Sequence, residues 1–69
     1  MKLSARNQIN GRIVEVRKGQ TTAHLRIDIC NGVVITSSIT NEAVDELGLK
    51  VGDAAIAVIK ASDVMMAIP

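Results

Sequence analysis

The chain has 69 residues, of which 48% are apolar and none is aromatic, and its formal net charge is +1. A chain this short buries only about 60% of its unfolded surface and usually needs a disulfide, a metal or oligomerisation for stability. One cysteine and one histidine exclude an internal disulfide and a four-ligand zinc site, which leaves oligomerisation, and the near-neutral charge argues against a general polyanion binder.

The sequence predicts neither a membrane-spanning helix nor a secretory signal. No run is long and apolar enough to cross a bilayer. The first residues, MKLSARNQ, contain one lysine but no apolar region after it, which argues against a signal peptide. A single thiol without a partner suits a reducing compartment. We therefore expect a cytoplasmic protein.

Three strands are expected in the first half of the chain. The β-branched residues within Ile9–Gly19 predict the first strand, and Gly19 lies in the turn that follows it. Alternation of apolar and polar residues over Thr21–Cys30 is typical of a half-buried strand. The residues on its apolar face are Ala23, Leu25, Ile27 and Ile29. The dipeptide Asn31–Gly32 predicts a hairpin to a third strand, VVITSSI, at residues 33–39.

One short helix and two further strands are expected in the second half. Thr40 or Asn41 can cap the N-terminus of a helix, and Gly48 ends this helix after about two turns. The run AAIAVIKA predicts a strand over residues 54–61, and VMMAI predicts a last strand over residues 64–68.

The expected fold class is all-β. Five strands, or six if Lys2–Asn7 also forms one, with a single helix between the third and fourth strands, are the layout of a small Greek-key β-barrel of OB type. A two-sheet sandwich is the main alternative. The length allows one domain, residues 1–69.

The residues available for catalysis do not form a recognisable reactive arrangement. His24 lies on the polar face of its strand, with no serine near it in a nucleophile motif. Cys30 has no neighbouring base that would activate its thiol. Asp45 and Glu46 are adjacent on the helix and point in different directions, so they do not form a catalytic carboxylate pair. The sequence therefore predicts a protein that is not an enzyme and has no cofactor.

Several residues that could bind an anion, through a positive charge or a hydrogen-bond donor, lie at the ends of the expected strands and helix. Just before the first strand, Arg6 offers a planar fork of donors and Ser4 a hydroxyl. Lys60 ends an otherwise apolar strand. Thr40 stands where the first-turn amides of the helix lack intrahelical partners and the helix dipole favours negative charge. Each feature alone is more often a surface residue or a cap, and composition does not show that they converge.

Three stretches of the chain resemble a known family. SARNQINGRI near the N-terminus, TNEAVDELGLKVGD in the middle and AVIKASDVMMA at the end are similar to the molbindins, or Mop proteins, which are small molybdate-binding proteins. The resemblance covers essentially the whole chain. It implies an OB-type barrel that assembles as a homohexamer, a trimer of dimers, with oxyanion sites between subunits. It also implies binding of molybdate, and of tungstate as a close mimic, with no side chain coordinated to the metal itself.

The resemblance also implies which residues bind the oxyanion. One subunit would contribute the residues before the first strand and after the fourth, namely Ser4, Ala5 through its backbone N–H, Arg6, Lys60 and Ala61. A neighbouring subunit would contribute Thr40 and Ala43. Family members often have serine in place of Ala43, so one hydroxyl is missing here. A second class of site, near the threefold axis, is expected in the turn formed by Lys18, Gly19, Gln20, Thr21 and Thr22.

The sequence therefore predicts a protein that binds molybdate for storage or buffering of molybdenum. Molybdate is a tetrahedral dianion with acceptor oxygens only, so it needs a shell of donors together with positive charge. A nucleic-acid-binding OB module is one alternative, but its stacking platform needs aromatic residues, and this chain has none. A purely structural oligomerisation domain is the other. We expect neither nucleic acid nor a membrane as a partner.

Overall fold

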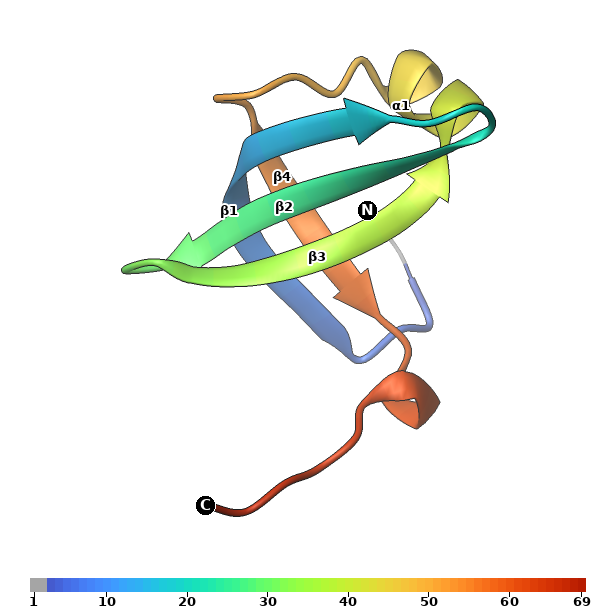
Figure 1. Cartoon of the computed structure of the whole chain (residues 1–69). Helices are drawn as coiled ribbons and strands as arrows, with labels where there is room; N and C mark the ends of the chain where they lie inside the picture. The colour runs from blue at the N-terminus through green and yellow to red at the C-terminus, as the bar shows by residue number, and fades with distance from the viewer. Residues whose placement is uncertain (1–2) are drawn as a thin grey trace.

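Four strands and one short helix make up most of the computed structural model, which describes residues 3–69 (Figure 1). The strands are β1 (Asn7–Lys18), β2 (Thr22–Cys30), β3 (Val33–Thr40) and β4 (Ala54–Ile59). The helix α1 (Asn41–Leu47) lies between β3 and β4, and a 3₁₀ turn (Ala61–Asp63) follows β4. The expected mostly-β fold with one short helix is confirmed.

All four strands pair antiparallel in one sheet of order β3-β2-β1-β4. The first half of β1 pairs with β4 and the second half with β2, so β1 bends and β4 crosses beneath the other strands (Figure 1). The alternative of a two-sheet sandwich is wrong for residues 3–69, which form one sheet. The sheet stays open in the single chain, because β3 and β4 are both edge strands.

Gly11 lies where β1 passes from one partner strand to the other. A Cβ atom at this position would lie 2.6 Å from Cγ2 of Ile27 and 2.8 Å from the carbonyl oxygen of Asp28. Real Cβ atoms do not approach other atoms this closely, so only glycine allows β1 to cross β2 at this distance.

The core is aliphatic, as the lack of aromatic residues requires. Its buried members are Ile13, Ala23, Leu25, Ile27, Val44 and Ala57. Three of them come from the expected apolar face of β2, and Ile29 packs against the cluster as a half-buried residue. The register of β2 against β3 shifts between Asp28 and Cys30, which ends the clean alternation at that point.

The local turn and helix signals are confirmed. Asn31 and Gly32 adopt φ angles of 46° and 84°, as the tight hairpin between β2 and β3 requires. Thr40 caps α1, since its Oγ1 accepts a hydrogen bond from the backbone N–H of Ala43 at 3.1 Å. Gly48 ends the helix with φ at 64°. Within residues 3–69, no helix is long and apolar enough to cross a membrane.

Both ends of the chain differ from expectation. Residues 3–6 form no strand, and Lys2, the first residue of the strand considered there, lies outside the described residues. β4 ends at Ile59 rather than at residue 61, because the 3₁₀ turn begins directly after Lys60. The last strand expected over residues 64–68 is wrong for the single chain. This turn directs the segment away from the edge of β4, so it is extended without a partner among residues 3–69 (Figure 1).

Candidate functional site

The residues before β1 and after β4 meet at one end of the molecule. Asn7 is the register partner of Ile59, so Arg6 and Lys60 flank the same antiparallel pair. The side-chain Nδ2 of Asn7 donates to the carbonyl oxygen of Ile59 at 3.2 Å. The structure therefore brings Ser4–Arg6 and Lys60–Ala61 to the same end of the sheet.

Two amide side chains that the sequence reasoning missed support this end of the sheet. Asn7 reinforces the pairing of β1 with β4, and Nε2 of Gln8 donates to the carbonyl oxygen of Ala5 at 3.2 Å. The hydrogen bond from Gln8 holds in place the segment that contains Ser4 and Arg6. The only sequence signal was the position of both amides within the SARNQ stretch.

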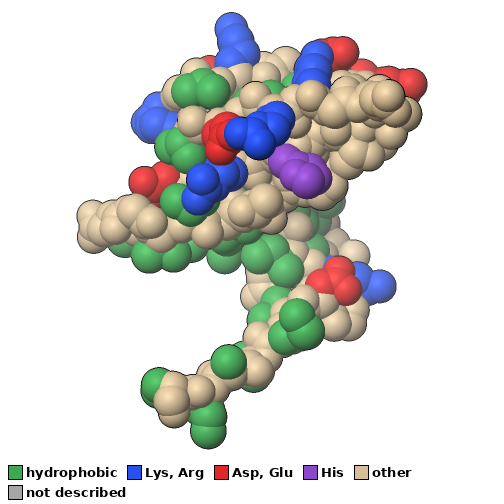
Figure 2. Space-filling view, in the orientation of Figure 1, with side chains coloured by type: hydrophobic (Ala, Val, Ile, Leu, Met, Phe, Trp, Pro, Cys, Tyr) green, Lys and Arg blue, Asp and Glu red, His purple; other side chains and the backbone are tan. Residues whose placement is uncertain are grey.

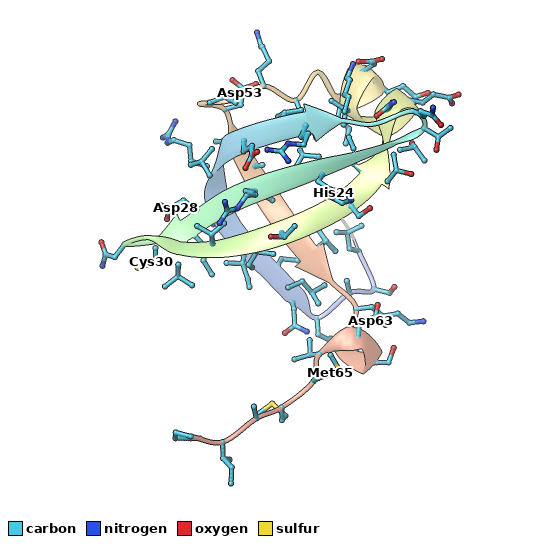
Figure 3. All side chains as sticks on the ribbon, in the orientation of Figure 1. His24, Asp28, Cys30, Asp53, Asp63 and Met65 are labelled. Carbon is cyan, nitrogen blue, oxygen red and sulfur yellow. The ribbon has the colours of Figure 1, made fainter. Side chains whose placement is uncertain are left out.

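The cations at this end are available to an anion. The ion pairs within residues 3–69 join Glu15 to Arg17 and to Arg26, and Lys18 to Asp45, so neither Arg6 nor Lys60 takes part in them. Both Arg6 and Lys60 are exposed. Asp63 lies in the adjacent 3₁₀ turn, where its backbone N–H donates to the carbonyl oxygen of Lys60 at 2.9 Å (Figure 3).

Thr40 and Ala43 lie at the other end of the sheet. Thr40 is the last residue of β3 and the register partner of Thr22, which follows the far end of β1. Arg6 directly precedes the first residue of β1, so the 12 residues of this strand separate the two positions (Figure 1). A single chain therefore does not place Thr40 beside Arg6 and Lys60.

One of the hydrogen-bond donors expected beside Thr40 is already used by the helix cap. The N–H of Ala43 donates to Oγ1 of Thr40 at 3.1 Å, so in the single chain this N–H serves the cap. A hydroxyl that accepts one hydrogen bond still has its own proton to donate. The donor that Thr40 offers to an anion is therefore its hydroxyl, while Ala43 is half-buried beside it.

The turn considered for a second site lies next to Thr40 and is tied to α1. Nζ of Lys18 forms an ion pair with Oδ1 of Asp45 at 2.5 Å. Asn41 donates its backbone N–H to the carbonyl oxygen of Thr21 at 2.8 Å and its side-chain Nδ2 to that of Gly19 at 2.9 Å. Because Asp45 neutralises Lys18, this turn offers less positive charge to an anion than its sequence implied.

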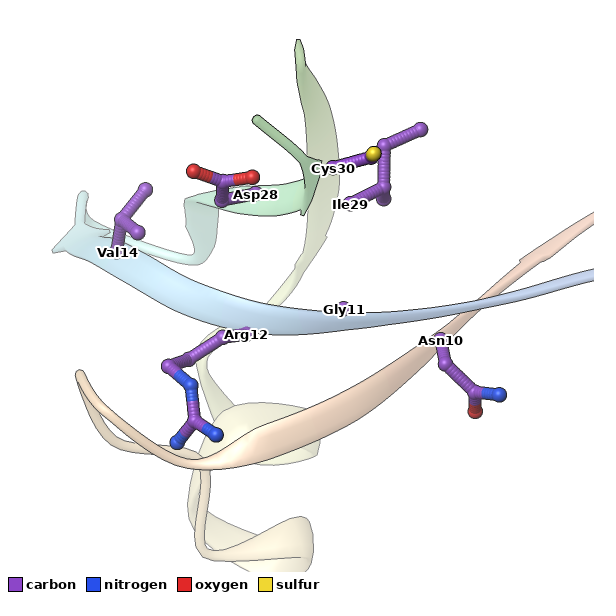
Figure 4. A pocket seen from close by; sticks show the side chains of 7 residues that line it. All are labelled: Asn10, Gly11, Arg12, Val14, Asp28, Ile29 and Cys30. Carbon is purple, nitrogen blue, oxygen red and sulfur yellow. The ribbon is translucent and has the colours of Figure 1, made fainter. Parts of the chain in front are cut away.

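A separate hollow of about 440 Å³ lies at the bend of β1 (Figure 4). Gly11, Arg12, Asp28 and Cys30 are among the residues that line it, and none of the expected site residues does. Nη1 of Arg12 donates to the carbonyl oxygen of Gly52 at 2.6 Å, so this guanidinium supports the loop before β4. Within residues 3–69, no group of three or more His, Cys, Asp or Glu side chains could hold a metal ion.

Comparison with known proteins finds relatives along the whole chain. The TOBE domain family matches residues 3–66. A probable molybdenum-pterin-binding protein of Haemophilus influenzae is 46% identical over 68 residues, which cover 99% of each chain. The solved structure of a molybdate-binding protein from Sporomusa ovata superposes with a TM-score of 0.92 at 31% identity, covering 99% of this chain and 100% of that one. The cytoplasmic molybdate-binding protein ModG, solved with molybdate bound, gives a TM-score of 0.93 at 45% identity, covering 100% of this chain and 49% of that one.

Proposed function

The chain belongs to the TOBE domain family, and we propose that it binds molybdate, with tungstate as a close mimic, at sites formed between copies of the chain. The resemblance to the molbindins is confirmed by full-length relatives named molybdenum-pterin-binding proteins. The names of these relatives and of the solved structures describe binding rather than catalysis, which supports a protein that is not an enzyme. The role we assign to it is storage or buffering of molybdate in the cytoplasm.

The main support for a shared site is that the donors lie at opposite ends of the sheet in a single chain. Arg6 and Lys60 lie at one end of the sheet, and Thr40 lies at the other. A dianion with four acceptor oxygens needs donors and positive charge on several sides, so neither end is complete alone. A second copy that presents its helix N-terminus to the two cations supplies the missing donors.

Each residue of the proposed site makes a different contact with the ion. Arg6 offers a planar fork to two oxygens of the ion, and Lys60 offers a point charge. Ser4 and Thr40 donate hydroxyls. The backbone N–H groups come from Ala5 and Ala61, whereas Ala43, whose N–H is donated to Oγ1 of Thr40 in the single chain, borders the site beside that hydroxyl. A hydrogen bond to a charged group contributes roughly 1.5–3 kcal/mol, so several together reach the net value of about −8 kcal/mol that micromolar affinity requires.

Selectivity follows from the chemistry of competing ions. Sulfate has the same charge and shape but is smaller, so a cavity matched to molybdate leaves its oxygens too far from some donors. Phosphate carries a proton at neutral pH, and this additional donor finds no acceptor in a site built from donors. Equal affinity for sulfate in a calorimetric titration would contradict the argument from size.

The proposed assembly is a homohexamer of OB-type barrels arranged as a trimer of dimers, with residues 1–69 acting as one domain in each copy. Its support is the small aliphatic core, which leaves many large apolar residues exposed in the single chain. Binding at an interface couples ligand and assembly, so molybdate stabilises the oligomer. The turn Lys18–Thr22 remains the candidate for a second class of site, and neither nucleic acid nor a membrane is a proposed partner.

Native mass spectrometry with and without molybdate tests this function directly, because it reports the size of the assembly and the number of bound ions together. We expect six copies that gain the mass of several molybdate ions. A monomer that binds the ion would contradict the shared site, and an oligomer that binds none would contradict the assigned ligand.

A further inference from the structure

The segment Ser4–Arg6 is joined to the rest of the chain by one hydrogen bond. Residues 3–6 form no strand. Nε2 of Gln8 donates to the carbonyl oxygen of Ala5 at 3.2 Å, and within residues 3–69 no other hydrogen bond or ion pair reaches this segment. The segment that contributes Ser4, Ala5 and Arg6 to the proposed site therefore depends on Gln8 for its path.

Gln8 reaches this carbonyl because of its place in β1. It is the second residue of the strand, and it is the register partner of Val58 in β4. The pairing fixes the backbone of Gln8, while its side chain is exposed. The amide at the end of that side chain carries two N–H donors. Gln8 thus connects a paired strand to a segment that has no strand partner.

The hydrogen bond fixes the direction of the peptide group that joins Ala5 to Arg6. Peptide bonds within residues 3–69 are trans, and the C=O and N–H of a planar trans peptide point in opposite directions. The carbonyl oxygen of Ala5 faces the amide of Gln8, so the N–H of Arg6 points away from it. This N–H donates to no backbone acceptor in the described part of the chain, and it is available to an ion.

The order of this segment matters because few cations lie at this end of the molecule. Most of the Lys and Arg side chains visible in Figure 2 lie in the upper half of the view, away from the 3₁₀ turn that follows Lys60. Affinity for a dianion at this end therefore depends on how well the donors of Ser4–Arg6 are aligned with Lys60.

We infer that Gln8 is a positioning residue of the proposed oxyanion site. It orients the Ala5–Arg6 peptide before the ion arrives, and it raises the affinity without being a ligand itself. A segment that is ordered in advance loses less conformational entropy when the ion binds. The inference rests on the proposed function, because the order of this segment affects affinity only if an ion binds there.

The test removes the donor and keeps the length of the side chain. Methionine is as long as glutamine but has no N–H, so the variant is Gln8→Met. The matched control is Asn10→Leu, which removes an exposed amide two residues along β1, on the same face of the strand. NMR gives the order parameter of the Arg6 amide without molybdate, and isothermal titration calorimetry gives the molybdate affinity.

For Gln8→Met we expect a lower order parameter at Arg6 in the ion-free protein and a molybdate affinity reduced about 3- to 10-fold. The midpoint of thermal unfolding stays at the native value, because the side chain is exposed. Asn10→Leu is expected to match the native chain in all three measurements.

The inference is overturned if Gln8→Met leaves the order parameter of Arg6 unchanged, because Gln8 would then act as a direct ligand or not at all. It is also overturned if the order parameter falls while the affinity does not. A native chain that binds no molybdate would be a different result, since it contradicts the proposed function and the inference with it.

Discussion

Asn7 and Ile59 are register partners, and Nδ2 of Asn7 donates to the carbonyl oxygen of Ile59 at 3.2 Å. This pair joins positions that lie 52 residues apart in the sequence. It brings the residue before β1 and the residue after β4, Arg6 and Lys60, to the same end of the sheet. Two cations held in this way by backbone pairing form the preorganised half of the proposed oxyanion site.

The first prediction concerns these two cations. Arg6→Ala and Lys60→Ala are each expected to weaken molybdate binding by roughly 10- to 100-fold, because each removes a charge-assisted hydrogen bond. Isothermal titration calorimetry measures the change. Arg26→Ala is the control, since it removes one positive charge in the middle of β2, where Arg26 pairs with Glu15. Unchanged affinity in both site variants would show that the residues are assigned wrongly.

The second prediction separates the two roles of Thr40. Aspartate is at least as good a helix cap as threonine, but its carboxylate offers no donor and repels a dianion, whereas serine keeps both the cap and the hydroxyl. Thr40→Asp is therefore expected to lower molybdate affinity at least about 10-fold without a loss of thermal stability, and Thr40→Ser to change neither. If Thr40→Asp binds molybdate normally, Thr40 only caps the helix.

The third prediction is a gain of affinity. Ala43 lies in the first turn of α1, beside the hydroxyl of Thr40, and its N–H is used by the cap. Serine at this position would supply a further hydroxyl to the ion. We expect Ala43→Ser to lower the dissociation constant for molybdate by about 3- to 10-fold, while Ala54→Ser, an exposed strand position, has no effect. A weaker or unaltered site in Ala43→Ser would remove this residue from the proposed contacts.

The fourth prediction concerns the bend of β1. A methyl group at Gly11 would lie 2.6 Å from a side-chain atom of Ile27, so Gly11→Ala forces β1 away from β2. We expect a loss of about 1–3 kcal/mol in the free energy of unfolding, measured by urea denaturation at one fixed protein concentration. Asn10→Ala, at the exposed neighbouring position, is the control. Equal stability of Gly11→Ala and the native chain would mean that β1 can shift at no cost.

The local features of the fold could be predicted from the sequence. The hairpin at Asn31–Gly32, the cap at Thr40 and the end of the helix at Gly48 each depend on residues within one turn, and all three are confirmed. The end of β4 and the path of residues 64–68 depend on which strand edge is within reach. Composition carries no information about that distance, so the pattern of residues 64–68 predicts a strand that the single chain does not form.

For the candidate site, too, the properties of single residues could be predicted from the sequence, but contacts between distant residues could not. The residue types suited to an oxyanion could be recognised from the sequence, because donors and charges are properties of single residues. Their convergence depends on the register between β1 and β4, which places Arg6 near Lys60 and leaves Thr40 at the opposite end. The engagement of Lys18 by Asp45 is likewise a contact between distant elements. Only the folded chain reveals either relationship.

The central claim is that one site takes Arg6 from one copy and Thr40 from another, and mixing two variants that each bind molybdate weakly tests it most directly. Arg6→Ala and Thr40→Asp chains are unfolded together, refolded as mixed assemblies and titrated with molybdate. If the copies mix at random, about a quarter of the interfaces combine an intact Arg6 with an intact Thr40, and we predict that this fraction of high-affinity binding returns. Mixed assemblies that bind no better than the separate variants would contradict a site shared between copies.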